Sequence, residues 1–151
     1  MEKKPDTPGG LPQKRMCVDF RALNQIVHIR SFPLPLIDDI LASLKGTTHF
    51  TTLDMRSGYH QIPLTNEASD KCAFSCFRGK FKYKVLPYGL KNSGNEFQRM
   101  VSTLLDRLEE LSMAYVDVIL IYTKNSLEDH LKHVQIVIDR LNKHTLRLKF
   151  F

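Results

Sequence analysis

The sequence is poor in cysteine and has no long apolar run, and each absence excludes a class of protein. Its 151 residues include only three cysteines, Cys17, Cys72 and Cys76. This small, odd number favours reduced thiols, which we interpret as small core residues, over a disulfide framework. No stretch approaches the roughly 20 apolar residues of a membrane span, and the polar first residues are unlike a signal peptide. We therefore expect an intracellular protein, in the cytoplasm or nucleus, with no membrane contact.

Acidic residues are also scarce relative to basic ones. The chain has 16 Asp and Glu against 22 Lys and Arg, which gives a formal charge of +6. This balance favours an anionic partner, with nucleic acid as the first candidate, although a merely solubilising surface explains it equally well. A hydrophobic content of 42% is enough for one domain with its own core.

Apolar periodicity predicts an α+β domain that follows a flexible leader. Residues 1–13 are rich in proline and glycine, which leave little for a helix or strand, so residues 14–151 form the expected domain. In the first half we expect a strand edge at 16–20, a helix from Ile37 to Gly46 with one core face, and a strand from His49 to Met55. A strand pair within 72–86, turned at 78–80, comes next, and a helix follows that opens with a Ser93/Glu96 capping box and whose apolar stripe reaches Leu111. An apolar run at 113–122 and a helix that begins at Ser126 complete the expected elements. Helices on one face of a mainly antiparallel sheet follow from this order. His130 and His133 lie three residues apart on the last helix, and we interpret them as a solvated edge.

Asp117 is an isolated carboxylate in the otherwise uncharged run MAYVDVILIY. Such an acid is costly to bury unless it is paired or binds a cation. Two interpretations remain open, a tight turn between two short strands and a metal ligand, and both can hold together.

Asp54 ends a second uncharged strand, FTTLD, where it is either a helix N-cap or a further metal ligand. Two acids from separate strands that meet at one place, together with phosphate oxygens, provide the hard oxygen ligands that Mg²⁺ prefers. Phosphoryl transfer is the chemistry that this pair favours.

Six blocks in a fixed order resemble a known family. They are RMCVDFRALN at 15–24, FPLPLIDDI at 32–40, FTTLDMRSGYHQIPL at 50–64, LPYGLKNSGNEFQRM at 86–100, YVDVILIYT at 115–123 and HLKHV at 130–134. Together they resemble the reverse transcriptase of gypsy-type LTR retrotransposons, over about residues 14–149. The resemblance implies the palm of that enzyme, a ferredoxin-like antiparallel sheet with helices on one face, plus part of the fingers.

The resemblance also implies roles for individual residues. Asp54 and Asp117 match catalytic metal-binding aspartates, and the backbone carbonyl of Met55 matches a further metal contact, so that two Mg²⁺ ions are expected. The implied substrates are dNTPs on an RNA or DNA template–primer duplex. The residues that match substrate-binding positions are Arg15, which meets the triphosphate, Tyr59, which excludes a 2′-hydroxyl, and Tyr88 and Gln98. Tyr59 also has a simpler interpretation as a core tyrosine.

The stretch 71–91 contains six Lys or Arg and no acid, interleaved with aromatic residues. It is either a surface that follows a phosphate backbone or a solvated strand face with lysines at 80, 82 and 84.

The chain departs from the family most sharply at Val118, which occupies the place of the second Asp in Tyr-x-Asp-Asp. Loss of this charge beside a dication is expected to slow polymerisation by a factor on the order of 10² to 10⁴. Gly94 occupies a proline position, and Glu96 adds an acid to a helix expected to face substrate. We also expect the thumb and RNase H regions to be absent. The sequence thus leaves open an impaired polymerase, an inactive nucleic-acid-binding domain, and a protein-interaction module that uses the surface a thumb would cover.

Overall fold

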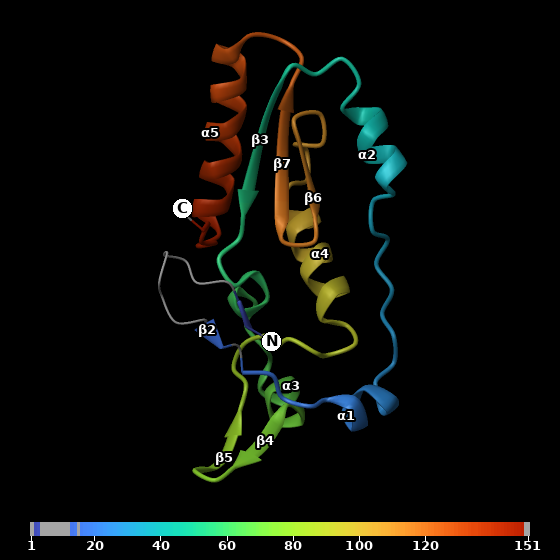
Figure 1. The fold of residues 1–151 in the computed structure, drawn as a ribbon, viewed down its shortest axis with the longest axis vertical. Coiled ribbons are helices and arrows are strands. Elements are labelled where there is room, and N and C mark those ends of the chain that lie inside the picture. The colour runs from blue at the N-terminus through green and yellow to red at the C-terminus, as the bar shows by residue number, and fades with distance from the viewer. Residues whose placement is uncertain (1, 4–12, 15, 150–151) are drawn as a thin grey trace.

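The computed structural model of the protein describes residues 2–3, 13–14 and 16–149. The molecule is elongated, with a sheet and two long helices toward one end and a small hairpin at the other (Figure 1). Its elements are β1 (Glu2–Lys3), β2 (Gln13–Lys14), α1 (Arg21–Ile26), α2 (Ile37–Ser43), β3 (His49–Asp54), the 3₁₀ helix η1 (Gly58–Gln61), α3 (Asn66–Lys71), β4 (Ala73–Cys76), β5 (Gly79–Lys82), α4 (Ser93–Leu104), β6 (Ser112–Tyr115), β7 (Val118–Thr123) and α5 (Leu127–Lys143).

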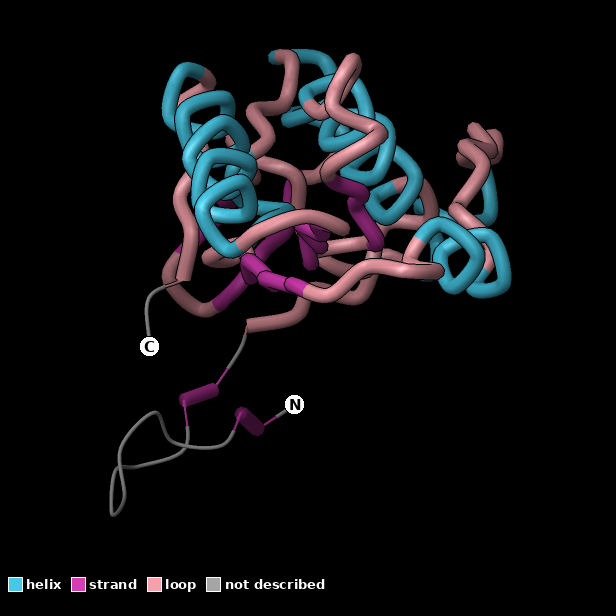
Figure 2. The backbone as a smooth tube through the Cα atoms, turned by 90° about the horizontal axis from the view of Figure 1, so that it is seen from above, coloured by secondary structure: helices cyan, strands magenta, loops and turns pink. Residues whose placement is uncertain are grey.

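The central sheet has three antiparallel strands in the order β3-β7-β6. α5 packs on β7 and β3, whereas α4 packs on β6. Both helices lie on the same side of the sheet (Figure 2), as the α+β prediction required. The apolar run predicted at 113–122 is therefore two strands, and Asp117 lies in the turn between them.

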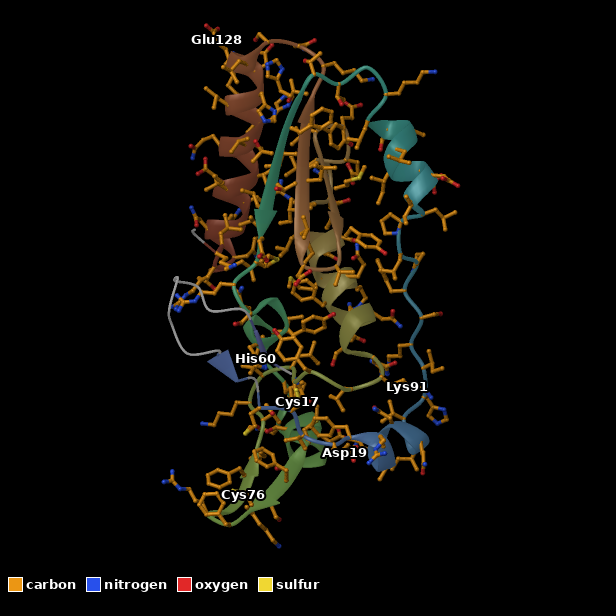
Figure 3. The ribbon with its side chains drawn as sticks, in the orientation of Figure 1. Cys17, Asp19, His60, Cys76, Lys91 and Glu128 are labelled. Atoms are coloured by element: carbon orange, nitrogen blue, oxygen red, sulfur yellow. The ribbon has the colours of Figure 1, made fainter. Side chains whose placement is uncertain are left out.

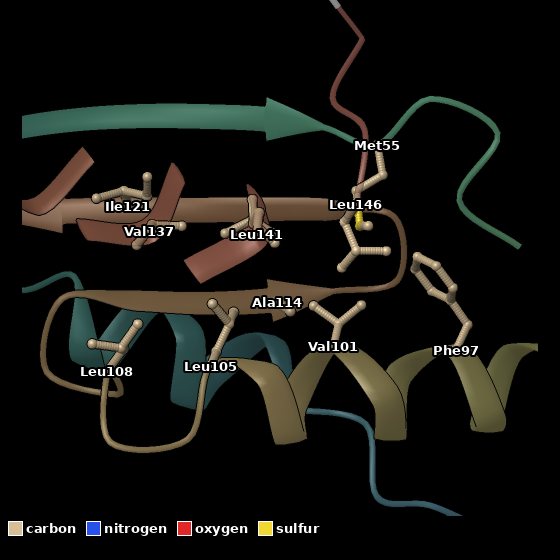
Figure 4. Close-up of a cluster of buried hydrophobic side chains, with 11 residues drawn as sticks. Met55, Phe97, Val101, Leu105, Leu108, Ala114, Ile121, Val137, Leu141 and Leu146 are labelled. Atoms are coloured by element: carbon tan, nitrogen blue, oxygen red, sulfur yellow. The ribbon is translucent and has the colours of Figure 1, made fainter. Parts of the chain in front are cut away.

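The core fills the space between this sheet and its two helices (Figure 4). Alternate residues of a strand point to opposite faces, so Ile119 and Ile121 of β7 enter the core together with Phe97 and Val101 of α4, all at 0% exposure. Leu141 of α5 packs in the same core and is 1% exposed. Burial of these side chains is the main source of stability of the sheet and its helices.

The other face of the sheet is open. Phe50, Tyr115 and Val118 are 51%, 43% and 38% exposed there. α2 lies beyond β6 in Figure 1 and has no buried residue, so the prediction that one of its faces is core was wrong. Of its regularly spaced apolar residues, Ile40 and Leu44 are half-buried and Ile37 and Leu41 are exposed.

The hairpin end differs from the sequence prediction in its boundaries. β4 pairs with β5 through a turn at Phe77 and Arg78, earlier than the predicted turn at residues 78–80. Residues 16–20 are not a strand, and α1 begins directly after them. The leader, predicted to lack regular structure, contains β1 and the first residue of β2, which pair antiparallel.

The helix ends show which local signals hold. Ser126 caps α5 by accepting a hydrogen bond from the Asp129 amide at 3.2 Å, as predicted. The predicted capping box of α4 was wrong, because Asn92 is the N-cap and the Ser93 hydroxyl donates to the Pro87 carbonyl at 2.9 Å. α4 also ends at Leu104, well before the predicted end of its apolar stripe.

The burial of the cysteines differs from the sequence prediction. Cys17, Cys72 and Cys76 are free thiols, but only Cys72 is buried, so the interpretation of all three as core residues was wrong. Within residues 2–3, 13–14 and 16–149, no helix has the length and apolar character to cross a bilayer.

His130 is buried beneath the end of the sheet, so the prediction of a solvated edge was wrong for this residue. It is 4% exposed, and its two ring nitrogens lie 2.8 Å from the Thr51 hydroxyl and 3.0 Å from the Thr123 hydroxyl. Thr123 also bonds His133 Nδ1 at 2.8 Å. Burial lowers the pKa of His130, and positive charge on His49 of β3 and His133 of α5 lowers it further.

This lowered pKa predicts loss of stability in acid. Below the ordinary value of 6.5 the unfolded chain binds a proton that folded His130 resists, so the free energy of unfolding should fall as pH drops through that value. Urea unfolding at pH 7.5 and pH 5.5 measures the fall. His130→Gln should reduce it, and His28→Gln, at an exposed position, should retain the wild-type fall; equal pH dependence in both variants would contradict the assignment.

Candidate active site

Two carboxylates lie at neighbouring strand ends. Asp54 is the last residue of β3 and is paired with Val118, the first residue of β7, while Asp117 immediately precedes Val118. The Met55 amide donates to the Asp117 carbonyl at 3.1 Å, which joins the two strand ends directly. The antiparallel register therefore brings together the two acids that the sequence separates by more than sixty residues.

The Asp117 turn has an unusual backbone. Tyr115 pairs with Val118, so Val116 and Asp117 form a two-residue hairpin loop. Val116 has φ +54°, a left-handed conformation that hairpin loops usually give to glycine and that strains a β-branched residue.

Gln98 supports this turn from α4. It is 0% exposed; its Oε1 accepts from the Val116 amide at 2.8 Å and its Nε2 donates to the Ala114 carbonyl at 2.9 Å. The sequence predicted that Gln98 binds substrate. The structure instead buries its amide behind the hairpin, on the core side of α4.

Tyr59 lies in η1 between two other aromatic rings. Its ring stacks on Phe97 with centroids 5.0 Å apart and lies 5.1 Å from the ring of Tyr88. Burial raises the pKa of Tyr59, and the negative charge of Asp117 raises it further. Tyr59 is thus half-buried among aromatic rings, in line with its interpretation as a core tyrosine, and its contact with a nucleotide sugar stays a prediction.

Tyr88 continues the aromatic contacts toward the hairpin end. Its ring meets that of His60 at 4.8 Å in an edge arrangement, and His60 lies between the central sheet and the β4–β5 hairpin (Figure 3). The sequence prediction missed His60, which has no pattern of its own beyond its place beside Tyr59.

Gly58 was missed as well. A Cβ added there would lie 2.7 Å from Phe97 Cζ and 2.9 Å from Cε2, too close for any side chain. Gly58 therefore allows η1 to approach α4, which sets the height of Tyr59 above Phe97. Chain order gives no signal for such an approach.

Arg15 lies outside the described residues. Two arginines near α4, Arg30 and Arg99, line a cavity of about 230 Å³ together with Ser31, Phe32, Asn95 and Glu96. Glu96 pairs with Arg99 at 2.6 Å and with Arg30 at 3.9 Å, so the acid that departs from the family pattern offsets both basic groups.

The oxygen ligands at the strand ends fit a hard cation, but they include one acid fewer than the family's pattern. Asp54 and Asp117 offer carboxylate oxygens and Val118 offers none. Across the described residues, no group of three or more His, Cys, Asp or Glu side chains is arranged to hold a metal.

A three-stranded antiparallel sheet with two helices on one face and paired aspartates at adjacent strand ends defines a polymerase palm, with the β4–β5 hairpin as part of the fingers. The family model described as reverse transcriptase (RNA-dependent DNA polymerase) matches residues 2–150. The chain therefore belongs to the reverse transcriptase family.

Similar proteins agree with this assignment. The Tf2-3 and Tf2-7 transposon polyproteins of Schizosaccharomyces pombe are each 41% identical over 133 residues, which is 87% of this chain and 10% of each polyprotein. A solved foamy viral protease-reverse transcriptase in complex with double-stranded DNA has TM-score 0.82 at 26% identity, covering 96% of this chain and 25% of that one. The same type of protein in complex with an RNA/DNA hybrid has TM-score 0.77 at 25% identity, covering 89% and 18%. The chain thus spans a small part of each relative, and it is a reverse transcriptase domain of the LTR-retrotransposon kind.

The close packing at Gly58 yields a stability prediction. Gly58→Ala should lower the free energy of unfolding by about 1–3 kcal/mol, because its methyl group would overlap the Phe97 ring. Gly94→Ala is the matched control and should cost nothing, since its Cβ would lie 3.7 Å from the Tyr59 hydroxyl and Ala is the better helix former. Urea unfolding compares the two, and equal stability of both variants would contradict the close approach.

Proposed function

We propose that this domain carries out template-directed DNA synthesis from dNTPs by phosphoryl transfer, at a rate reduced by Val118. The observation that carries the proposal is the register that sets Asp54 against Val118 with Asp117 next to it. The nucleic-acid complexes of the foamy viral relatives support a template–primer duplex as the partner.

The side chains around the strand ends suit this reaction. Asp54 and Asp117, with the Met55 carbonyl, would hold Mg²⁺, which supplies charge neutralisation at the reacting phosphates. Tyr59 would lie under the nucleotide sugar, with its ring fixed between Phe97 and Tyr88. Its planar, braced ring is a rigid surface against which a 2′-hydroxyl would collide. Arg15, which lies in the fingers block of the sequence, would meet the triphosphate.

Val118 limits the electrostatics of the same site. It is partly exposed on the open face directly across from Asp54, so an acid at 118 would place its charge beside the other two. Without that acid, two carboxylates are left to balance cations and phosphates, and the transition state loses stabilisation.

Val118→Asp therefore tests the proposal. We expect single-nucleotide addition on an RNA template to rise by roughly 10² to 10⁴ fold, from several kcal/mol of added charge stabilisation. Val118→Asn is the matched control, because it adds an oxygen of similar size without a charge, and it should gain far less.

Two further measurements separate the causes of a negative result. Binding of Mn²⁺ by the same variants distinguishes a missing metal site from failure to hold a primer. Asp54→Asn in the Val118→Asp background should abolish the gain. Robust extension by the unmodified chain would show that Val118 is no impairment.

A second candidate is a catalytically inactive domain that binds nucleic acid. The β4–β5 hairpin favours it: Lys80 and Lys84 are exposed and form no ion pair within the part of the chain that is described, whereas Lys82 pairs with Asp70. Phe77 and Phe81 are 96% and 46% exposed on the same hairpin. Exposed lysines and exposed aromatic rings in one segment suit phosphate and base contacts of a nucleic-acid strand. Under this candidate the open face of the sheet would be available to a protein partner.

Salt dependence tests the hairpin surface. If Lys80 and Lys84 each contact a phosphate, Lys80→Ala/Lys84→Ala should weaken binding of an RNA/DNA duplex and flatten its log–log salt slope by about 1 per lost contact. Lys124→Ala, beyond the far end of β7, is the matched control and should leave the slope unchanged. An unchanged slope in the double variant would assign the lysines to a solvated surface.

A further inference from the structure

The outer edge of β6 is bonded by a side chain instead of a strand. β6 is an edge strand, so Ala114 C=O and Val116 N–H, which flank Tyr115, point away from β7. Gln98 bonds both groups, with its Oε1 on the Val116 amide at 2.8 Å and its Nε2 on the Ala114 carbonyl at 2.9 Å. The amide thus pairs with the strand as a peptide group of a neighbouring strand does.

This arrangement is specific to glutamine. Gln98 Nε2 also donates to Ser102 Oγ at 3.3 Å, so both of its N–H groups and one lone pair of its oxygen are used. A flipped amide would set N–H against N–H at Val116 and oxygen against oxygen at Ala114. Gln98 is also fully buried, so its amide is directed at the strand and not at solvent.

The bond to Val116 acts where the backbone is strained. Val116 has φ +54°, a conformation that strains a β-branched residue, so surrounding contacts must hold it. The next residue, Asp117, is fixed on its other side by the Met55 amide on its carbonyl. Hydrogen bonds from Gln98 of α4 and from Met55 at the end of β3 therefore hold the turn on both sides.

We infer that Gln98 is a positioning residue for Asp117: its amide ties the edge of β6 to α4 and holds Val116 in the left-handed conformation that directs the Asp117 carboxylate. The inference rests on the proposed function, because it gives Gln98 a role in the chemistry through Asp117. A buried glutamine that merely satisfies its own hydrogen bonds would stabilise the fold without affecting metal binding.

Gln98→Met tests the inference, because methionine keeps the length and volume and removes the hydrogen bonds. Loss of the buried acceptor should speed hydrogen exchange of the Val116 amide by roughly 10 to 100 fold. Affinity for Mn²⁺ should fall by about tenfold or more, in the wild-type and Val118→Asp backgrounds alike. Ser102→Ala removes only the third bond of Gln98, and it should change both quantities by less than about twofold.

A rescue separates positioning from packing. Val116→Gly in the Gln98→Met background should recover part of the lost Mn²⁺ affinity, since glycine adopts positive φ without strain. A packing defect at Gln98 would not respond to glycine in the turn. If Gln98→Met does not fold, Gln98→Asn retains an amide that is one methylene too short to reach the strand, and it should show the same losses.

The outcomes are distinct. Unchanged exchange at Val116 in a folded Gln98→Met protein, or unchanged Mn²⁺ affinity where the wild type binds the ion, would overturn the inference. If neither the wild type nor Val118→Asp binds Mn²⁺, the proposed function fails, and with it any role of Gln98 in the chemistry; fast exchange at Val116 would then assign Gln98 to the fold alone.

Discussion

The antiparallel pairing of β3 with β7 is the constraint on which the rest of the site depends. Its register sets Asp54 opposite Val118 and leaves Asp117 in the adjoining turn, with the Met55 amide on the Asp117 carbonyl. A slip of one residue would turn over one of the two strands, and thus send either the carboxylate of Asp54 to the helix-covered face or the core residues Ile119 and Ile121 to solvent. Burial of the core and placement of the acids are therefore enforced by the same pairing.

The shape of the site and its charge depend on different residues. Gln98 holds the turn, Gly58 lets η1 approach Phe97, and Tyr59 is braced between two rings. These contacts are made by packing and neutral hydrogen bonds, which a change from Asp to Val on the open face does not disturb. Val118 is partly exposed and supports no core residue. The fold therefore tolerates valine at a position where the proposed metal site would gain from a charge.

Sequence patterns predicted helices and strands correctly where no distant contact competed with the local one. The period of two from His49 to Met55 predicted β3, which ends one residue earlier at Asp54, and the serine at 126 predicted the start of α5. Prediction was wrong where a distant contact competed: the Ser93 hydroxyl bonds Pro87 instead of capping α4, and His130 is covered by β3 and β7. α2 has helical spacing of apolar residues, but none of them is fully buried. Spacing indicates which side chains share a face, and only a neighbouring element can bury that face.

The sequence by itself determined the family, the two acids and the valine that replaces the third, because these depend on residue identity and order. It left open whether Asp117 is in a turn or binds a metal, and it assigned Gln98 to substrate. Only the tertiary structure decided that Asp117 is in a strained hairpin turn beside Asp54 and that Gln98 binds the edge of β6. The reason is that hydrogen-bond partners far apart in the chain are chosen by how the sheet and α4 pack, and local order does not encode that choice.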